Sequence, residues 1–91
     1  MFIMTKAAGA RLADRLAKQS AGEDVAMRFN RHRKRRGWTL RLDKPCTSDA
    51  TFFHNGRIVL VLDERSSHSL RNRMLDVRET DEGPRLRLRG A

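Results

Sequence analysis

The residues of this chain best suited to bind a partner are the cations of the segment 31–36, which reads Arg-His-Arg-Lys-Arg-Arg. A cluster of permanent charges must face water or an anion, because burying unpaired charge is very costly. Guanidinium groups match phosphate and carboxylate oxygens, and Phe29 or Trp38 could add a stacking contact. We therefore predict an anion-binding or partner-binding loop, with a solvated loop as the alternative. The expected contact residues are Arg31, Arg33, Lys34, Arg35, Arg36 and Trp38.

A metal or nucleophilic site would have to use Cys46, the single cysteine, together with His32, His54 and His68. No two of these residues have a ligand spacing such as Cys-x-x-Cys or His-x-x-x-His. One thiol also excludes an internal disulfide and any all-cysteine metal site within a monomer. We therefore expect no metal ligands and no cofactor.

Paired carboxylates occur three times, as Glu23 with Asp24, Asp63 with Glu64, and Asp81 with Glu82. All three pairs fall at expected turns or at a helix start, where acids serve as caps and solubilising groups. The sequence has no Gly-rich phosphate loop, no Gly-x-Ser-x-Gly and no His-Glu-x-x-His. We predict that the chain is not an enzyme.

The composition indicates one basic domain covering residues 1–91. Lys and Arg number 20 against 11 Asp and Glu, and the formal charge of +9 favours an anionic partner, either an acidic protein or nucleic acid. The hydrophobic fraction is only 38%, but the apolar residues fall in periodic runs typical of a folded chain. No apolar run suits a signal peptide or a membrane span, so we expect a cytoplasmic protein with no membrane partner.

The elements that must position these residues begin with a short edge strand at 2–4. Thr5 has the character of a helix N-cap, and the following helix should run from about residue 6 to residue 20. Gly22 is the expected stop signal. The buried stripe of this helix should consist of Ala8, Leu12 and Leu16.

Period-two alternation then predicts paired strands around 25–29 and 38–42, with the cationic loop between them. Asn55 and Gly56 lie between two apolar runs, which favours a type I′ hairpin. The run 58–62 is apolar on both faces, so this strand should be central and covered on each side.

Asp63 should cap a second, short helix through Ser66 and Leu70, and strands are expected at 75–77 and 85–89. Arginines that alternate along strands, namely Arg28, Arg85, Arg87 and Arg89, are expected on solvent-facing sides. The order of elements predicts an α+β fold with mostly antiparallel or mixed sheets, as a small sandwich or pseudo-barrel with an N-terminal helix and a second short helix.

These elements resemble the HesB/IscA family, the A-type iron–sulphur carriers. The likeness is carried by the Asn55-Gly56 hairpin, the apolar run 58–62 ending in Asp63, and the segment Leu75-Asp76-Val77. The segments Phe2-Ile3-Met4-Thr5 and Met27-Arg28-Phe29 agree as well. The resemblance covers nearly the whole chain and implies a single HesB/IscA-like domain, a setting near iron–sulphur assembly and a homo-oligomer.

The three cysteines with which the family's carriers hold iron or a cluster have no counterpart here. The loop cysteine of the family falls on or near Arg35, the Cys-Gly-Cys tail is missing before Gly90-Ala91, and Cys46 matches neither place. A guanidinium group cannot ligate a metal. The resemblance therefore implies a degenerate metal site.

Three functional hypotheses remain. The first is a non-enzymatic accessory or binding protein of this family, which contacts an acidic protein or other anion through the basic loop. The second is a nucleic-acid or other polyanion binder that uses the same loop, with Trp38 or Phe29 stacking on a base. The third keeps iron or iron–sulphur binding through Cys46 and histidine ligands in an oligomer.

Overall fold

The structure is a computed structural model that describes residues 1–32, 34 and 36–90. Along the chain the elements are β1 (Ile3–Met4), α1 (Lys6–Lys18), β2 (Ala26–Arg31), β3 (Trp38–Asp43), β4 (Ala50–His54), β5 (Arg57–Leu62), α2 (Glu64–Ser69), β6 (Arg73–Thr80) and β7 (Gly83–Gly90). This is the predicted α+β class with two helices. No helix in the described ranges is long and apolar enough to cross a membrane.

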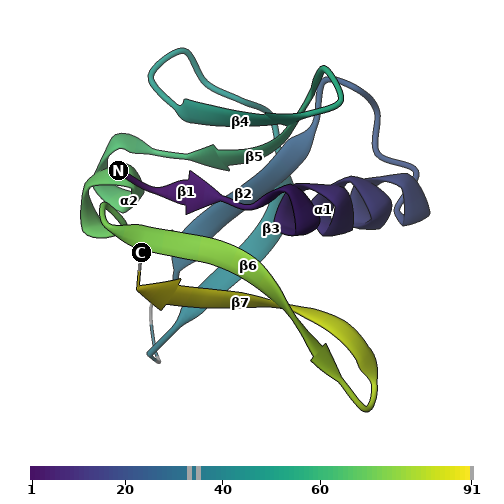
Figure 1. The fold of residues 1–91 in the computed structure, drawn as a ribbon. Helices are drawn as coiled ribbons and strands as arrows, with labels where there is room; N and C mark the ends of the chain where they lie inside the picture. The colour runs from purple at the N-terminus through teal and green to yellow at the C-terminus, as the bar shows by residue number, and fades with distance from the viewer. Residues whose placement is uncertain (33, 35, 91) are drawn as a thin grey trace.

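The strands form two mixed sheets. One has the order β1-β6-β7 and the other the order β3-β2-β5-β4. The pairs β1–β6 and β2–β5 are parallel, whereas the hairpin pairs β2–β3, β4–β5 and β6–β7 are antiparallel. Helix α1 contacts strands of both sheets (Figure 1). The sheets are separate, so the described strands do not close into a barrel.

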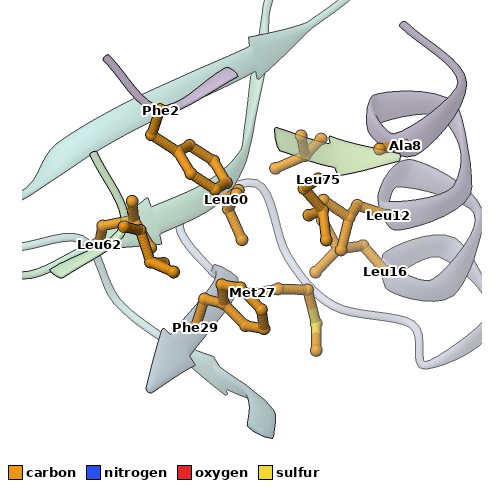
Figure 2. Packing of buried hydrophobic residues seen from close by; sticks show 11 residues of the cluster. Phe2, Ala8, Leu12, Leu16, Met27, Phe29, Leu60, Leu62 and Leu75 are labelled. Carbon is orange, nitrogen blue, oxygen red and sulfur yellow. The ribbon is translucent and has the colours of Figure 1, made fainter. Parts of the chain in front are cut away.

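The core is built around β5, which lies inside its sheet between β2 and β4. Its residues Val59, Leu60, Val61 and Leu62 have no exposed surface, which confirms the central strand predicted from the run 58–62. The stripe of α1 packs into the same cluster, together with Met27 and Phe29 of β2 and Leu75 of β6 (Figure 2). Burial of this cluster from both sheets and from α1 is the main stabilising contribution.

The β4–β5 hairpin turns at Asn55 and Gly56, as predicted. Their φ angles are 50° and 80°, so both central residues lie in the left-handed region that a type I′ turn requires. Phe53 pairs with Ile58 beside a register shift in β4, and its side chain is exposed. The turn therefore joins the covered strand β5 to a partner at the edge of the sheet.

Helix α1 begins at the predicted N-cap, Thr5. The Thr5 hydroxyl accepts a hydrogen bond from the Ala8 N–H at 3.1 Å and donates one to Asp76 Oδ1 at 2.9 Å. The Thr5 N–H also donates to the Leu75 carbonyl at 3.0 Å. The same residue thus starts the helix and ties it to β6.

The end of α1 differs from the prediction, because the helix stops at Lys18 rather than near residue 20. Ser20 takes the left-handed position at φ 53°. The Ala21 N–H bonds to the Leu16 carbonyl and the Ser20 N–H to the Ala17 carbonyl, which is the Schellman pattern. Ser20 therefore terminates the helix, a role that the sequence had assigned to Gly22.

Two strands are longer than expected. The sequence predicted strands at 75–77 and 85–89, but β6 and β7 pair continuously from Arg73–Gly90 to Thr80–Gly83. The added residues are mostly polar in β6 and are glycine or proline in β7, so they lack the apolar alternation that marks a strand in sequence. Pairing with the neighbouring strand extends them.

Replacing Leu60 by alanine tests the central role of β5. The side chain is fully buried, so we expect the free energy of unfolding to fall by about 3 kcal/mol through lost burial and the cavity left behind. Phe53→Ala on β4 is the control, because that side chain is 58% exposed and should cost less than about 1 kcal/mol. Urea denaturation followed by circular dichroism measures both; equal losses would contradict this account of the core.

Candidate functional site

The cationic segment lies at the end of the β2–β3 hairpin, as predicted. The two strands pair from Ala26–Asp43 to Arg31–Trp38, and the His32 N–H donates to the Gly37 carbonyl at 3.0 Å. Gly37 has φ 110°, a conformation that favours glycine. We call residues 31–37 the hairpin tip.

Three of the five predicted cations can be placed. Arg31, Lys34 and Arg36 are exposed, and no carboxylate oxygen of the described residues lies within 4 Å of their charged nitrogens. Arg33 and Arg35 lie outside the described residues. The placed charges of the hairpin tip are therefore exposed and have no carboxylate partner among the described residues, although the Arg31 guanidinium lies over the Trp38 ring.

Trp38 lies at the base of the hairpin tip between an aromatic neighbour and a cation. Its ring centroid is 5.2 Å from that of Phe29 with an angle of 34° between the planes, and the Arg31 guanidinium carbon lies 5.6 Å from the Trp38 ring centroid. Phe29 is only 6% exposed, so it cannot stack on a ligand without rearrangement. Trp38 is half-buried and already has two partners.

Arg28 contradicts the expectation that it faces solvent, because its side chain is only 7% exposed. Its Nε donates to Asp43 Oδ2 at 2.7 Å, while Nη1 and Nη2 donate to the two carboxylate oxygens of Asp49 at 3.1 and 2.6 Å. The Asp49 side chain is 3% exposed. The chain thus buries this charge with two carboxylates that satisfy it, which alternation alone cannot reveal.

This cluster of Arg28, Asp43 and Asp49 also sets the charge state of its members. Hydrogen bonds from Arg28 hold the pKa of both carboxyl groups below their usual value. Backbone N–H groups contribute in the same direction, from Cys46 to Asp49 at 2.7 Å and from Lys44 to Asp43 at 2.8 Å. The hydrogen bond to Asp49 is also the main reason that the pKa of Arg28 is raised. The ion cluster therefore clamps β2, β3 and the loop that leads to β4.

Cys46 lies in that loop and is exposed. Its Sγ is 3.9 Å from Arg28 Nη2 and 4.0 Å from the Lys44 carbonyl. The three histidines considered as its co-ligands lie far apart along the chain: His32 at the hairpin tip, His54 at the end of β4 and His68 in α2. Within the described ranges, no three His, Cys, Asp or Glu residues are grouped so as to hold a metal ion.

The arginines of β7 are exposed, as predicted. Arg85 pairs with Glu82, and Arg89 lies 3.2 Å from Asp76 Oδ2. The pKa of Asp76 is lowered first by its hydrogen bond from the Val77 N–H, then by the Thr5 hydroxyl, with weaker contributions from Arg89 and Arg87. This face of the sheet therefore remains basic, although part of its charge is neutralised.

An open groove of about 700 Å³ lies between α1, the base of the hairpin tip and β7, and sequence reasoning missed it. The apolar residues that line it include Phe29, Trp38, Leu86 and Leu88, and Arg11 and Arg15 of α1 line it as well. The available signals were the four-residue spacing of these two arginines and the Arg-Leu alternation of 85–89. Neither signal shows that the two segments line the same groove.

Comparison with solved structures identifies the fold as that of known iron–sulphur proteins. The structure aligns with Escherichia coli SufA, a protein involved in the biosynthesis of iron–sulphur clusters, with a TM-score of 0.67 and 19% identity over 98% of this chain and 79% of SufA. It aligns with IscA in its crystal structure with the [2Fe-2S] cluster at a TM-score of 0.62 and 18% identity, over 99% of this chain and 85% of IscA. No protein-family model matches the sequence, and the comparison with curated proteins found no significant match.

The HesB/IscA resemblance is thereby confirmed at the level of the fold. An iron–sulphur cluster does not fit the residues present, because iron in such clusters is held by thiolates and the chain has only Cys46. The polar groups that contact this thiol are the Arg28 guanidinium and the Lys44 carbonyl, and the guanidinium cannot act as a ligand.

Asp49→Asn tests the clamp at Arg28. Removing one charge from a buried, hydrogen-bonded cluster should lower the free energy of unfolding by about 2–3 kcal/mol. Because the folded-state pKa of Asp43 and Asp49 is lowered, their stabilisation is complete above the unfolded-state value of about 4 and is lost as pH falls through the folded values.

We therefore expect the Asp49→Asn variant to lose less stability than the wild type on acidification. Urea titrations at pH 7, 4 and 3 measure this difference. Asp24→Asn is the control, since Asp24 is exposed and should change stability by no more than about 0.5 kcal/mol. An Asp49 variant as stable as this control would refute the clamp.

Proposed function

We propose that this chain is a non-enzymatic binding protein with the SufA and IscA fold, whose hairpin tip binds an acidic surface of a partner protein. The observation that carries the proposal is the exposure of Arg31, Lys34 and Arg36 without a carboxylate partner among the described residues. Arg33 and Arg35 belong to the same proposed contact through their place in the sequence.

Charge pairing elsewhere supports this choice of surface. Lys18, Arg28, Arg85 and Arg89 each have a carboxylate within 4 Å, so part of the excess charge is already neutralised. At the described positions of the hairpin tip, Arg31, Lys34 and Arg36 instead have no carboxylate within 4 Å and lie within one short segment. Arginine side chains in such an arrangement form bidentate contacts with carboxylates at protein interfaces.

An acidic protein is favoured over nucleic acid by the surroundings of Trp38. Binding of single strands relies on aromatic rings on which bases can stack. Phe29 is buried, and Trp38 is half-buried with Phe29 and Arg31 as its partners. The nucleic-acid hypothesis therefore lacks its stacking residue, whereas a carboxylate-rich surface needs only the charges.

The fold supports a cellular setting beside iron–sulphur assembly, since SufA is described as involved in the biosynthesis of these clusters. The cytoplasmic location is part of the proposal. We propose an accessory role in which the chain contacts another protein and carries no cluster itself. The competing hypothesis is that Cys46 binds iron in an oligomer, with histidines completing the site.

Neutralising the hairpin tip tests the proposed contact. The triple variant Arg31→Ala, Lys34→Ala and Arg36→Ala should weaken binding of a fluorescein-labelled oligoglutamate peptide at least tenfold at 0.1 M salt, because three charge contacts are removed. The control variant replaces Lys6, Arg65 and Arg71, three exposed cations on the two helices and just beyond α2, by alanine at the same net charge. Fluorescence anisotropy measures both.

Equal weakening in the two triple variants would show that only net charge matters and would refute the hairpin tip as the site. Tighter binding of a single-stranded oligonucleotide than of the peptide, lost in the hairpin variant alone, would replace the acidic protein by nucleic acid. Such binding would also show a logarithmic salt dependence proportional to the number of phosphates contacted.

Anaerobic reconstitution with iron and sulphide tests whether the chain carries a cluster. We expect the protein to stay colourless after desalting, because a lone thiol cannot supply the thiolates that a cluster requires. A stoichiometric visible absorption that disappears in the Cys46→Ser variant would contradict the accessory role and would support the oligomeric iron site.

A further inference from the structure

The groove beside β7 follows the open edge of a sheet. Strand β7 is the last strand in the order β1-β6-β7, so one of its sides has no neighbouring strand among the described residues (Figure 1). All residues from Pro84 to Leu88 line the groove. Since successive side chains of a strand point to opposite faces, an unbroken run of lining residues indicates that the groove runs along the strand edge and not only over one face.

The register shows which backbone groups face this edge. Antiparallel pairs alternate between hydrogen-bonded and non-hydrogen-bonded types, and Pro84, opposite Glu79, has no N–H to donate. The pair Glu79–Pro84 is therefore of the non-hydrogen-bonded type, and so are Val77–Leu86 and Leu75–Leu88. It follows that the N–H and C=O groups of Leu86 and Leu88 point away from β6 towards the groove.

The side chains around this edge form two chemically different rows. Leu86 and Leu88 are half-buried and pack against the core cluster, beside Trp38 and Leu40. Arg85 and Arg87 alternate with them and are exposed, and Arg85 already pairs with Glu82, an exposed residue that also lines the groove. Arg15 of α1 adds a further cation at the border, with no carboxylate of the described chain within 4 Å.

We propose that the free edge of β7 binds an extended segment of a partner protein in which acidic and apolar residues alternate. The segment adds as a further strand to the sheet, with hydrogen bonds to the backbone of Leu86 and Leu88. Its apolar side chains lie opposite these leucines and fill the groove over Trp38. Its carboxylates lie opposite Arg85 and Arg87, where cross-strand pairs of opposite charge are favourable.

The charge of β7 argues against a second copy of this chain as the occupant. Pairing two β7 strands would bring the arginine rows Arg85, Arg87 and Arg89 of both copies together, and like charges on neighbouring strands are destabilising. An acidic segment would avoid this repulsion, because its carboxylates attract the arginines of β7. This site adjoins the hairpin tip at Gly37, but its backbone contacts lie on β7, so it does not depend on the function proposed for the tip.

Peptide binding to the wild-type protein provides the main test. The probe is a capped, fluorescein-labelled heptapeptide in which glutamate and valine alternate, and binding is followed by anisotropy. N-methylation of the valines, whose N–H groups should face β7, is expected to weaken binding at least tenfold. N-methylation of the glutamates, whose N–H groups should face solvent, is the matched control and should change binding less than threefold.

Backbone hydrogen exchange measured by NMR locates the bound peptide. In the free protein, the amides of Leu86 and Leu88 should exchange faster than those of Arg85 and Arg87, and the peptide should slow the two leucine amides at least tenfold. If the leucine amides exchange slowly in the free protein and faster after dilution, a second copy of the chain is the occupant and the proposal is overturned. Stronger protection by a single-stranded oligonucleotide than by the peptide would also overturn it.

Side-chain variants separate this site from the hairpin tip. The double variant Arg85→Gln, Arg87→Gln should bind the peptide at least fivefold more weakly than the wild type. The control double variant Arg65→Gln, Arg71→Gln has the same net charge and should bind it less than twofold more weakly. The hairpin variant at Arg31, Lys34 and Arg36 should stay within threefold of the wild type. Equal effects of the two glutamine pairs, or peptide binding lost only in the hairpin variant, would refute the β7 edge as the site.

Discussion

The fold depends on the burial of β5 on both faces. A chain of 91 residues with 34% charged side chains has few apolar residues to spare, and four of them, Val59 to Leu62, are fully buried in this one strand. β2 and β4 hold it within its sheet, and the leucine stripe of α1 packs into the same cluster. Because the remaining surface is so polar, the other elements gain most of their burial by contact with this centre.

Much of the architecture could be predicted because local chemistry and tertiary packing agree. Thr5 caps α1, Asp63 caps α2, and Asn55 with Gly56 adopts the left-handed geometry that its residue types favour. The exceptions are places where an alternative residue satisfies the same geometry. Ser20 adopts the left-handed position expected near Gly22, and the ends of β6 and β7, which lack apolar alternation, become strand through pairing alone.

The binding surfaces were less predictable, because they depend on which segments the fold brings together. The hairpin tip is local in sequence and could be placed. Arg28 looked like an ordinary outward-facing strand residue, yet Asp43 and Asp49, 15 and 21 positions further along the chain, allow it to be buried. The groove combines residues of α1, β3 and β7, and no local pattern links these segments.

The pairing of β1 with β6 has a consequence for how the molecule is synthesised and folds. The hydrogen bond between Thr5 and Asp76 spans 71 positions, and β1 adds to its sheet only through this distant partner. Strand β1 therefore cannot pair with β6 until most of the polypeptide has left the ribosome. Such high contact order slows folding, so α1 and the β4–β5 hairpin, whose backbone hydrogen bonds are local, should form before the amino-terminal strand pairs with β6.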